Sequence, residues 1–289
     1  MNHKYNKLVI TGCFILLFLF PIISNAQEHE SKHESEEVEG TFNGPMLIDN
    51  QTVDVVEKNE LEFSFMQRFG NIKNDVDMFG LFSPENLRFG IDYGLIKNVS
   101  IGIGATKAKS IFDLNAKVVL FKQNTLSMPV TISFFGEASR SGMSENNFIN
   151  QDGEYNSMNR MSYFSELMIA RKFNDQFSLQ GALTYSYFNL IEETYSNSNL
   201  GVSILGRYMF HKHVALIGDY DLPLTNNNLP KQNMGIGLEF MGKSNSLQLF
   251  VSSRNTIVNS EYRVCNPNDF TKGELLFGFN ISHKWGLKN

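Results

Sequence analysis

Strict alternation of apolar and polar positions along residues 86–95 constrains this chain more than any other feature of its sequence. The apolar positions are Leu87, Phe89, Ile91, Tyr93 and Leu95, and those between them are Arg88, Gly90, Asp92 and Gly94. Because successive side chains of an extended strand point to opposite faces, the segment predicts a strand with one apolar face and one polar or small face. A sheet built from such strands needs two unlike environments, one for each face.

The same period-two pattern recurs through most of the chain. It predicts strands at residues 60–69, 86–95, 99–105, 112–120, 130–137, 163–169, 177–187, 200–210, 214–220, 234–240, 247–251 and 275–285. Neither a change in composition nor an alternation with helical patterns divides these segments into separate domains. We therefore expect an all-β fold over residues 59–289, a closed antiparallel up-and-down transmembrane β-barrel of twelve strands, with ten or fourteen strands as alternatives.

Connection lengths supply an independent test of this fold. Short links at 96–98, 122–127, 174–176, 211–213 and 242–246 alternate with long polar links at 71–85, 140–160, 189–198, 221–233 and 254–272. Only the link at 107–110 is short where the alternation requires a long one. Short periplasmic turns that alternate with long extracellular loops are typical of bacterial outer-membrane barrels, and an even strand count places both termini in the periplasm.

Aromatic residues fall toward the predicted strand ends, where rings suit the lipid–water interface. They include Tyr163, Tyr185, Tyr187, Tyr208, Phe210, Tyr220, Phe240 and Trp285. A soluble β-sandwich is the alternative, because its core also needs aromatic residues on one face. A sandwich requires no alternation of connection lengths, and the barrel is therefore favoured.

The first 26 residues have the features of a secretory signal peptide. Lys4 and Lys7 precede an apolar run at residues 14–23, and we expect cleavage after Ala26. The apolar stretch is shorter than the roughly 20 residues that a membrane-spanning helix needs. A lipoprotein signal at Cys13 is the alternative, but a lipidated cysteine follows the apolar run, and this one precedes most of it.

Cleavage after residue 26 would leave 263 residues, a formal charge of −7 in place of −5, and Cys265 as the only cysteine. This composition excludes an internal disulfide and disfavours a nucleic-acid binder. Residues 27–40 have almost no apolar side chain and are expected to form a disordered acidic periplasmic tail, in which His29 and His33 offer weak metal binding as an alternative role. Residues 41–58 mix a Gly-Pro turn with apolar side chains and are expected to pack against the periplasmic mouth or to enter it as a plug.

Four stretches of sequence resemble a known family. They are residues 60–70 (ELEFSFMQRFG), 79–81 (FGL), 86–94 (NLRFGIDYG) and 99–104 (VSIGIG). They are similar to an outer-membrane β-barrel family of Bacteroidota that is described as a domain of unknown function. The resemblance extends from about residue 41 to the C-terminus and implies the fold and the membrane compartment. It implies no activity, catalytic residue or cofactor.

Histidine positions test for the enzymes found among outer-membrane barrels, which place a general base near the outer rim. Beyond the signal, the histidines are His29 and His33 in the tail, His211 and His213 in a predicted periplasmic turn, and His283 near the periplasmic end of the last strand. None lies in a predicted extracellular loop, so a barrel enzyme is disfavoured. Zinc-ligand spacing and a phosphate-binding glycine loop are also missing, so we expect no cofactor, and Gly102 and Gly104 are interpreted as small lumen-facing residues.

Charged side chains at inward-facing positions are the candidate functional residues. They are Glu60, Glu62, Arg68, Arg88, Asp92, Asp113, Lys117, Glu137, Glu166, Arg207, Asp219, Glu239, Arg254, Glu274 and Lys284. Opposite charges in a narrow lumen are expected to pair, since an unpaired charge away from bulk water is costly. Two interpretations follow: a salt-bridge network that fills the barrel, or a polar, acid-biased passage that favours cations.

The polar inward face favours a passive pore or small-solute transporter in the outer membrane of a Gram-negative bacterium. The alternative is a closed structural barrel whose extracellular loops, such as residues 139–160 and 255–271, bind a partner or ligand. The expected partners are outer-membrane lipid, the barrel-assembly machinery and a small polar solute, with no nucleic acid.

Overall fold

Twelve long strands form one closed barrel in the computed structural model, which describes residues 36–76, 78–83, 86–150, 153–192, 195–225, 231–262 and 266–287. The strands are β3 (Glu60–Asn71), β4 (Asn86–Ile96), β5 (Val99–Thr106), β6 (Ile111–Phe121), β7 (Thr131–Arg140), β8 (Met161–Lys172), β9 (Phe177–Phe188), β10 (Ser198–His211), β11 (Val214–Pro223), β12 (Asn233–Met241), β13 (Asn245–Ser252) and β14 (Leu276–Gly286). Two short strands, β1 (Met46–Leu47) and β2 (Asn50–Gln51), pair with each other outside that sheet. The predicted fold class and the count of twelve barrel strands are confirmed.

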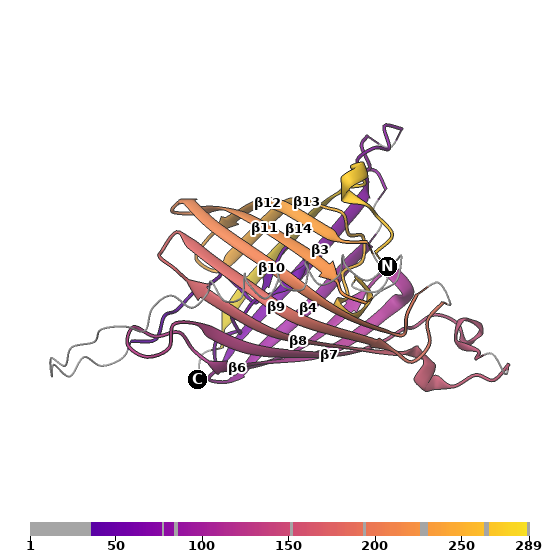
Figure 1. Ribbon diagram of the computed structural model, residues 1–289, viewed down its shortest axis with the longest axis horizontal. Helices are drawn as coiled ribbons and strands as arrows, with labels where there is room; N and C mark the ends of the chain where they lie inside the picture. Colours follow the sequence, from indigo (N-terminus) through magenta and orange to yellow (C-terminus); the bar gives the residue numbers. More distant parts are fainter. Residues whose placement is uncertain are drawn as a thin grey trace, which may run out of the picture. The chain divides into compact units, whose positions relative to one another are not determined.

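Each barrel strand pairs with its neighbours in sequence, and β14 pairs with β3 to close the ring (Figure 1). At this seam Ile281 lies opposite Phe65. The Phe65 ring centroid lies 5.0 Å from that of Phe89 and 5.8 Å from that of Phe279. Such aromatic pairs contribute about 0.5–1.5 kcal/mol each beyond the area they bury. Closure leaves no free sheet edge, so backbone groups are paired on both sides of every strand.

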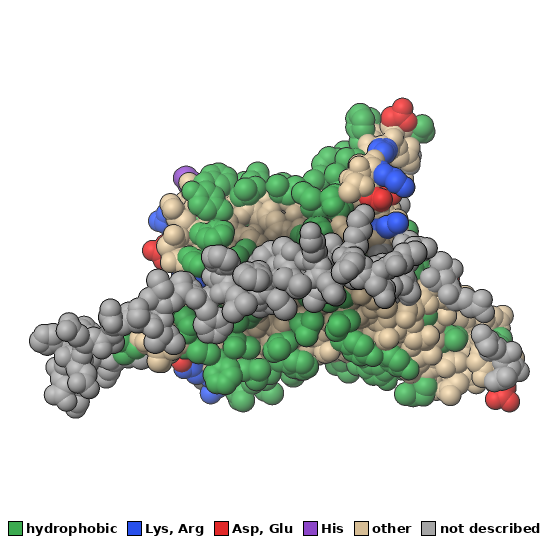
Figure 2. Space-filling view, viewed as in Figure 1, with side chains coloured by type: hydrophobic (Ala, Val, Ile, Leu, Met, Phe, Trp, Pro, Cys, Tyr) green, Lys and Arg blue, Asp and Glu red, His purple; other side chains and the backbone are tan. Residues whose placement is uncertain are grey.

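The apolar face of each strand is the outer surface of the barrel. On β4, Phe89 is 46% exposed and Arg88 beside it only 6% exposed, and on β6 Leu114 is 64% exposed and Asp113 only 4%. Figure 2 shows hydrophobic side chains spread over the outside of the strands. An apolar exterior around a polar interior is the arrangement that suits a barrel in lipid.

The two ends of the barrel differ in the length of their connections. The short-turn end carries the links β4–β5, β6–β7, β8–β9, β10–β11 and β12–β13, and the long-loop end carries the other six (Figure 1). The β5–β6 link is the exception, with only the single turn η1 (Ala108–Ser110). The longer loops carry η2 (Glu145–Phe148), η3 (Ser157–Arg160), α2 (Asn259–Tyr262) and η4 (Phe270–Lys272). This exception matches the sequence expectation. The β6–β7 link does not, because it spans residues 122–130 and is as long as the β9–β10 and β11–β12 links.

None of the helices in the described ranges has both the length and the apolar character to cross a membrane.

The first described residues attach to the short-turn end. The Val38 amide donates to the Gln123 carbonyl at 2.8 Å. The Glu37 carboxylate lies 3.0 Å from Lys97 Nζ and 3.2 Å from Lys122 Nζ, and these contacts hold its pKa below the ordinary value. This part of the chain is bound because its charge finds cationic partners, which departs from the disorder expected of the tail. The rest of that tail and the signal peptide lie outside the described residues.

Candidate functional site in the barrel interior

Residues 41–56, which we call the inner hairpin, lie inside the barrel. Gln180 of β9 accepts from Val53 N and donates to Gln51 O, both at 2.8 Å. Asn280 of β14 donates to Ile48 O at 2.7 Å. Strands β9 and β14 lie on opposite sides of the ring, so a segment that binds both runs through the lumen.

Apolar side chains anchor part of the inner hairpin. Leu47, Ile48 and Val53 are fully buried in a cluster with inward-facing residues of the barrel. These residues are Phe135, Phe164, Met168, Ala170, Ala182, Leu205, Ala215, Ile217 and Phe250. Burial of each large apolar side chain contributes about 1.5–3 kcal/mol. One sector of the lumen wall is therefore apolar and is covered by the hairpin. The candidate residues predicted from the sequence were all charged and did not include this sector.

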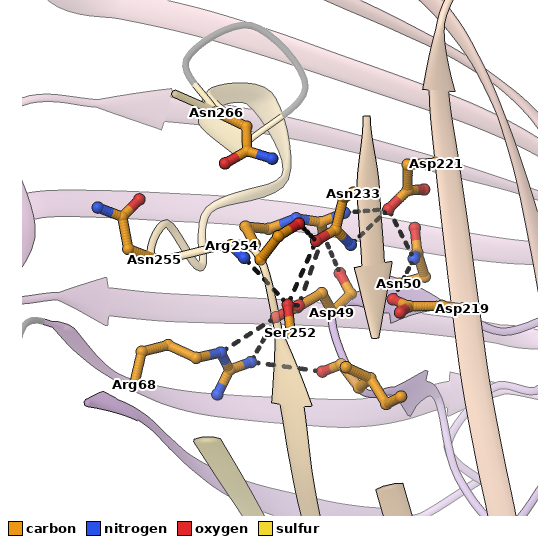
Figure 3. A network of polar contacts seen from close by, with 12 residues as sticks. Asp49, Asn50, Arg68, Asp219, Asp221, Asn233, Ser252, Arg254, Asn255 and Asn266 are labelled. Atoms are coloured by element: carbon orange, nitrogen blue, oxygen red, sulfur yellow. Dashed lines mark hydrogen bonds and ion pairs between the residues drawn. The ribbon is translucent and has the colours of Figure 1, made fainter. Parts of the chain in front are cut away.

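The hairpin tip carries the carboxylate of Asp49 into an ion-pair cluster (Figure 3). Arg68 Nη2 and Nε lie 2.6 and 3.1 Å from Asp49 Oδ1, and Ser252 Oγ donates to Asp49 Oδ2 at 2.9 Å. Arg254 pairs with both Asp49 and Asp221. The side chains of Asp49, Arg68 and Arg254 are at most 1% exposed. Buried charges persist when they are paired and hydrogen-bonded in this way.

The turn at the hairpin tip is strained. Ile48 has a φ of +52°, in the left-handed region that a β-branched residue rarely adopts. Such a conformation costs about 1–3 kcal/mol and persists when the surroundings determine it. Here the Ile48 amide donates to Gln248 Oε1 at 3.0 Å and its carbonyl accepts from Asn280.

Asn50, the residue after Asp49, joins the hairpin to the acidic side of the cluster. Its amide nitrogen donates to Asp219 Oδ2 at 2.7 Å and to Asp221 Oδ2 at 3.3 Å (Figure 3). Asp221 also accepts from Asn233 Nδ2 at 3.1 Å. Asp219 was expected in the lumen. Asp221 was missed, although it follows Asp219 at the same strand parity and is equally buried.

Lys117 makes three hydrogen bonds to the base of the hairpin, where Lys284 makes one, to Asn43 O. Lys117 Nζ donates to the carbonyls of Pro45 at 2.7 Å, Thr52 at 3.0 Å and Asp54 at 3.1 Å. The Asp54 carboxylate accepts from the Phe42 amide at 2.6 Å, and burial raises the pKa of this carboxyl. All three ammonium protons thus have backbone partners on the hairpin.

Two further predicted lumen pairs connect barrel strands to each other. Arg88 Nη2 lies 2.6 Å from Asp113 Oδ1, and Arg207 Nε lies 2.8 Å from Glu239 Oε2. All four side chains are buried. These contacts correspond to the salt-bridge network, the first of the two interpretations drawn from the sequence.

The remaining predicted charges have weaker or local partners. Glu166 and Glu137 are buried carboxylates, the first 3.5 Å from Ser203 Oγ and the second 2.6 Å from Asn259 Nδ2. Glu62 Oε2 lies 3.8 Å from Lys284 Nζ. Glu60 on β3 and Asp92 on β4 are half-buried.

The prediction for Glu274 is wrong. Strand β14 begins at Leu276, so Glu274 lies in the preceding loop, where its carboxylate accepts from the Asp269 amide at 2.7 Å. Assigning Glu274 to the lumen extends the period-two pattern two residues before the first residue of the strand. The carboxylate instead closes a local turn of its own loop.

The β13–β14 loop, residues 253–275, closes part of the lumen from the long-loop end. Ile257, Val258 and Ser260 are at most 3% exposed. Ser260 Oγ lies 3.0 Å from Ser162 Oγ of β8. In the closed-barrel alternative the sequence offers this loop as a surface that binds a partner, but its centre packs against the barrel wall. There Glu261 is buried, and its carboxylate lies 2.7 Å from Lys109 Nζ.

Two recesses remain on either side of the hairpin tip. One is lined by residues nearer the short-turn end, including Gly44, Glu62 and Asp92. The other is lined by Asn199, Gly201, Asp221, Leu222, Pro223, Lys231, Asn233 and Arg254. Ile48 binds Gln248 and Asn280 of the first lining, and Asn50 binds Asp221 of the second. The tip therefore stands between the two recesses.

In the described ranges no three His, Cys, Asp or Glu side chains are grouped so that they could hold a metal ion. The described histidines, His211, His213 and His283, lie at the short-turn end. His29 and His33 lie outside the described residues.

A family model described as "Membrane bound beta barrel domain (DUF5777)" matches residues 42–285. The chain belongs to this family. Except for residue 41 of the inner hairpin and residue 286 of β14, the match includes the whole hairpin and all twelve barrel strands, so the hairpin is part of the family's domain. The apolar exterior is accordingly the surface that meets the membrane. A comparison with curated protein sequences gave no match.

Solved structures of porins and channels share the fold. The NanC porin has a TM-score of 0.50 and 9% identity, and the match covers 78% of this chain and 100% of that one. The COG4313 outer membrane channel from Pseudomonas putida F1 has a TM-score of 0.50 and 7% identity, with 80% and 97% covered. At these identities the likeness concerns the architecture of the barrel.

Proposed function

We propose that this DUF5777 barrel is an outer-membrane channel for small polar solutes and that the inner hairpin holds it closed. The observation that carries the proposal is the polar bonding between hairpin and barrel, from Lys117 at the base to Asp49 at the tip. A barrel that served only as a scaffold could fill its lumen with apolar side chains, which are often as stabilising as buried ions or more so. Hydrogen bonds and ion pairs are contacts that water can replace when the hairpin leaves.

The proposal changes the passive pore expected from sequence into a gated one. Both the inner hairpin and the β13–β14 loop occupy the lumen, so conduction requires at least the hairpin to move. Placement in the outer membrane of a Gram-negative bacterium is supported by the alternation of short turns and long loops. The excess of carboxylates in the lumen supports a hydrated passage for polar solutes.

Planar-bilayer recording tests the proposal. The wild-type protein is expected to be closed for most of the time. A variant in which residues 46–53 are replaced by an equal length of glycine and serine keeps the chain connection and is expected to conduct steadily. Heat-modifiable gel migration verifies that both barrels are folded. Steady conductance of the wild type would contradict the plug, and a folded but silent replacement variant would contradict the channel.

A second candidate function is a closed barrel whose loops bind a partner. One observation favours it: in the β3–β4 loop, Val76 is 88%, Phe79 58% and Phe82 74% exposed. A photo-reactive residue at Phe82 tests it on intact cells, with lipid-facing Phe134 as the control position. A protein adduct formed only from position 82 would support this function, and adducts from neither position would remove it.

A further inference from the structure

We infer that Asp49 occupies the binding site of a solute carboxylate, and that a carboxylate-bearing solute opens the channel by taking its place. The inference rests on the proposed function and adds the class of solute and the means of opening. The barrel half of the site would have to bind the solute after the hairpin has left.

Barrel residues hold one edge of the Arg68 guanidinium, and the hairpin holds the other through Asp49 and through the Ile48 carbonyl, 3.4 Å from Nη2. Its Nη1 donates to Asn280 Oδ1 at 3.0 Å and to the Gln67 carbonyl at 2.9 Å, and its guanidinium carbon lies 4.6 Å from the centroid of the Phe250 ring. These contacts leave Nε and Nη2 directed at Asp49 Oδ1. A binding group held by the rigid strands β3, β13 and β14 keeps its position when the hairpin moves.

Charge balance favours an exchange of carboxylates over simple departure of the hairpin. If Asp49 left alone, Arg68 would exchange its counter-ion for water that enters the lumen, which is less favourable than the ion pair. A solute carboxylate restores the pair. The exchange leaves the lumen charge unchanged, so the nearby carboxylates of Asp219 and Asp221 face the same negative charge before and after it.

A second observation concerns the recess on the long-loop side of the tip and indicates the class of solute. Asn199, 2% exposed, lines the recess that Lys231 and Arg254 also line. Among the described residues neither atom of its amide has a hydrogen-bond partner, and the same holds for the hydroxyls of Ser186, its neighbour across β9–β10, and Thr184. Buried polar groups are nearly always bonded, so this strip suits the hydroxyl groups of a solute. The class indicated is a hydroxy-carboxylate.

The strained turn at the tip assists release. Ile48 adopts its left-handed conformation within the bonds to Gln248 and Asn280, and it is freed from this conformation when the hairpin withdraws. Strain at the point of contact makes a tethered carboxylate easier to displace than an unstrained one with the same ion pair.

A buried reporter thiol measures release directly. Val53→Cys places the thiol on the fully buried return of the hairpin, in a full chain that also carries Cys13→Ser and Cys265→Ser. Maleimide labelling is followed in detergent with lactate, phosphate, chloride or glycerol at equal concentration. Lactate is expected to speed labelling about fivefold or more, the lower end of typical coupling between sites. The other three additives are expected to have little effect.

Two arginine variants test whether the lactate response depends on Arg68. Arg68→Gln is expected to abolish the lactate response, whereas Arg88→Gln, which alters a buried pair that does not touch the hairpin, is expected to keep it. If Arg68→Gln fails to fold by gel migration, Asp49→Asn serves instead. It is expected to label fast without lactate and to gain nothing from lactate.

Three outcomes would overturn the inference: no lactate response in the wild-type reporter, an equal response to phosphate, or a response that survives in both Arg68→Gln and Asp49→Asn. Conductance separates this result from the proposed function. Lactate-dependent labelling without conductance would support the carboxylate site and contradict the channel. Conductance of the hairpin-replaced variant without any lactate response would support the channel and contradict the carboxylate site.

Discussion

Two buried arginine–aspartate pairs in this barrel have the same N–O distance of 2.6 Å but join different parts of the molecule. Arg88–Asp113 connects β4 to β6, both part of the closed sheet. Arg68–Asp49 connects β3 to the inner hairpin, which the sheet does not include. The first pair can separate only if the barrel unfolds, whereas the second can separate while the barrel stays intact. Connectivity, more than distance or burial, decides which buried ion pair can act as a switch.

The largest expected difference comes from removing the carboxylate charge in each pair. Asp113→Asn leaves Arg88 buried without its main partner and is expected to lower the free energy of unfolding by about 3–5 kcal/mol. Asp49→Asn is expected to lower it by about 1 kcal/mol or less, because the hairpin opens locally and water reaches Arg68. Urea unfolding followed by the fluorescence of Trp285, the only tryptophan, measures both. Equal losses would mean that the hairpin is as much a part of the folded barrel as β6.

The base of the hairpin offers a second, smaller comparison. Lys117→Met removes three bonds to buried carbonyls and is expected to weaken hairpin docking by about 2–4 kcal/mol. Lys284→Met removes one bond to the hairpin, at Asn43 O, and the 3.8 Å contact with Glu62 on the barrel. Because the lysine side chain is 34% exposed, hairpin docking is expected to weaken by less than about 1 kcal/mol. The rate of maleimide labelling of the Val53→Cys reporter, measured in each lysine variant, gives both changes in docking free energy. Similar rates in the two variants would show that Lys117 is not the main contact at the base.

The smallest effect is expected at the short-turn end. The lowered pKa of Glu37 means that its contacts stabilise the docked residues above the ordinary carboxyl pKa and lose that effect as the pH falls through the lowered value. Since the carboxylate is 40% exposed, solvent screens it, and Glu37→Gln is expected to lower the protection factor of the Val38 amide by less than about threefold at neutral pH. Hydrogen exchange measures this. If the protection factors of wild type and Glu37→Gln still differed in strong acid, the Glu37 contact would not depend on its charge.

Sequence patterning predicted the barrel because its wall obeys a strict period of two. Phe89 and Arg88 could be assigned to opposite faces from their positions alone, and Asp221 could have been added by the same rule. Asp49 could not be found in this way, since the hairpin has no repeating pattern and its partners are distant in sequence. The candidate site therefore has two parts. The inward-facing residues of the barrel wall follow from the periodicity of the sequence, whereas the position of Asp49 beside them is seen only in the tertiary structure.

Both ends of the inner hairpin are fixed at the short-turn end of the barrel. Val38 bonds to Gln123, and Asn59 accepts from Leu287 at 2.8 Å and donates to Gly94 O at 2.9 Å. A released hairpin cannot diffuse away and competes for Arg68 at an effective concentration in about the millimolar range. A free carboxylate of equal intrinsic affinity must reach a similar concentration to occupy half of the sites. The length of the tether would thus set the solute concentration at which the hairpin is displaced. Traces of solute would leave the barrel closed, and abundant solute would open it.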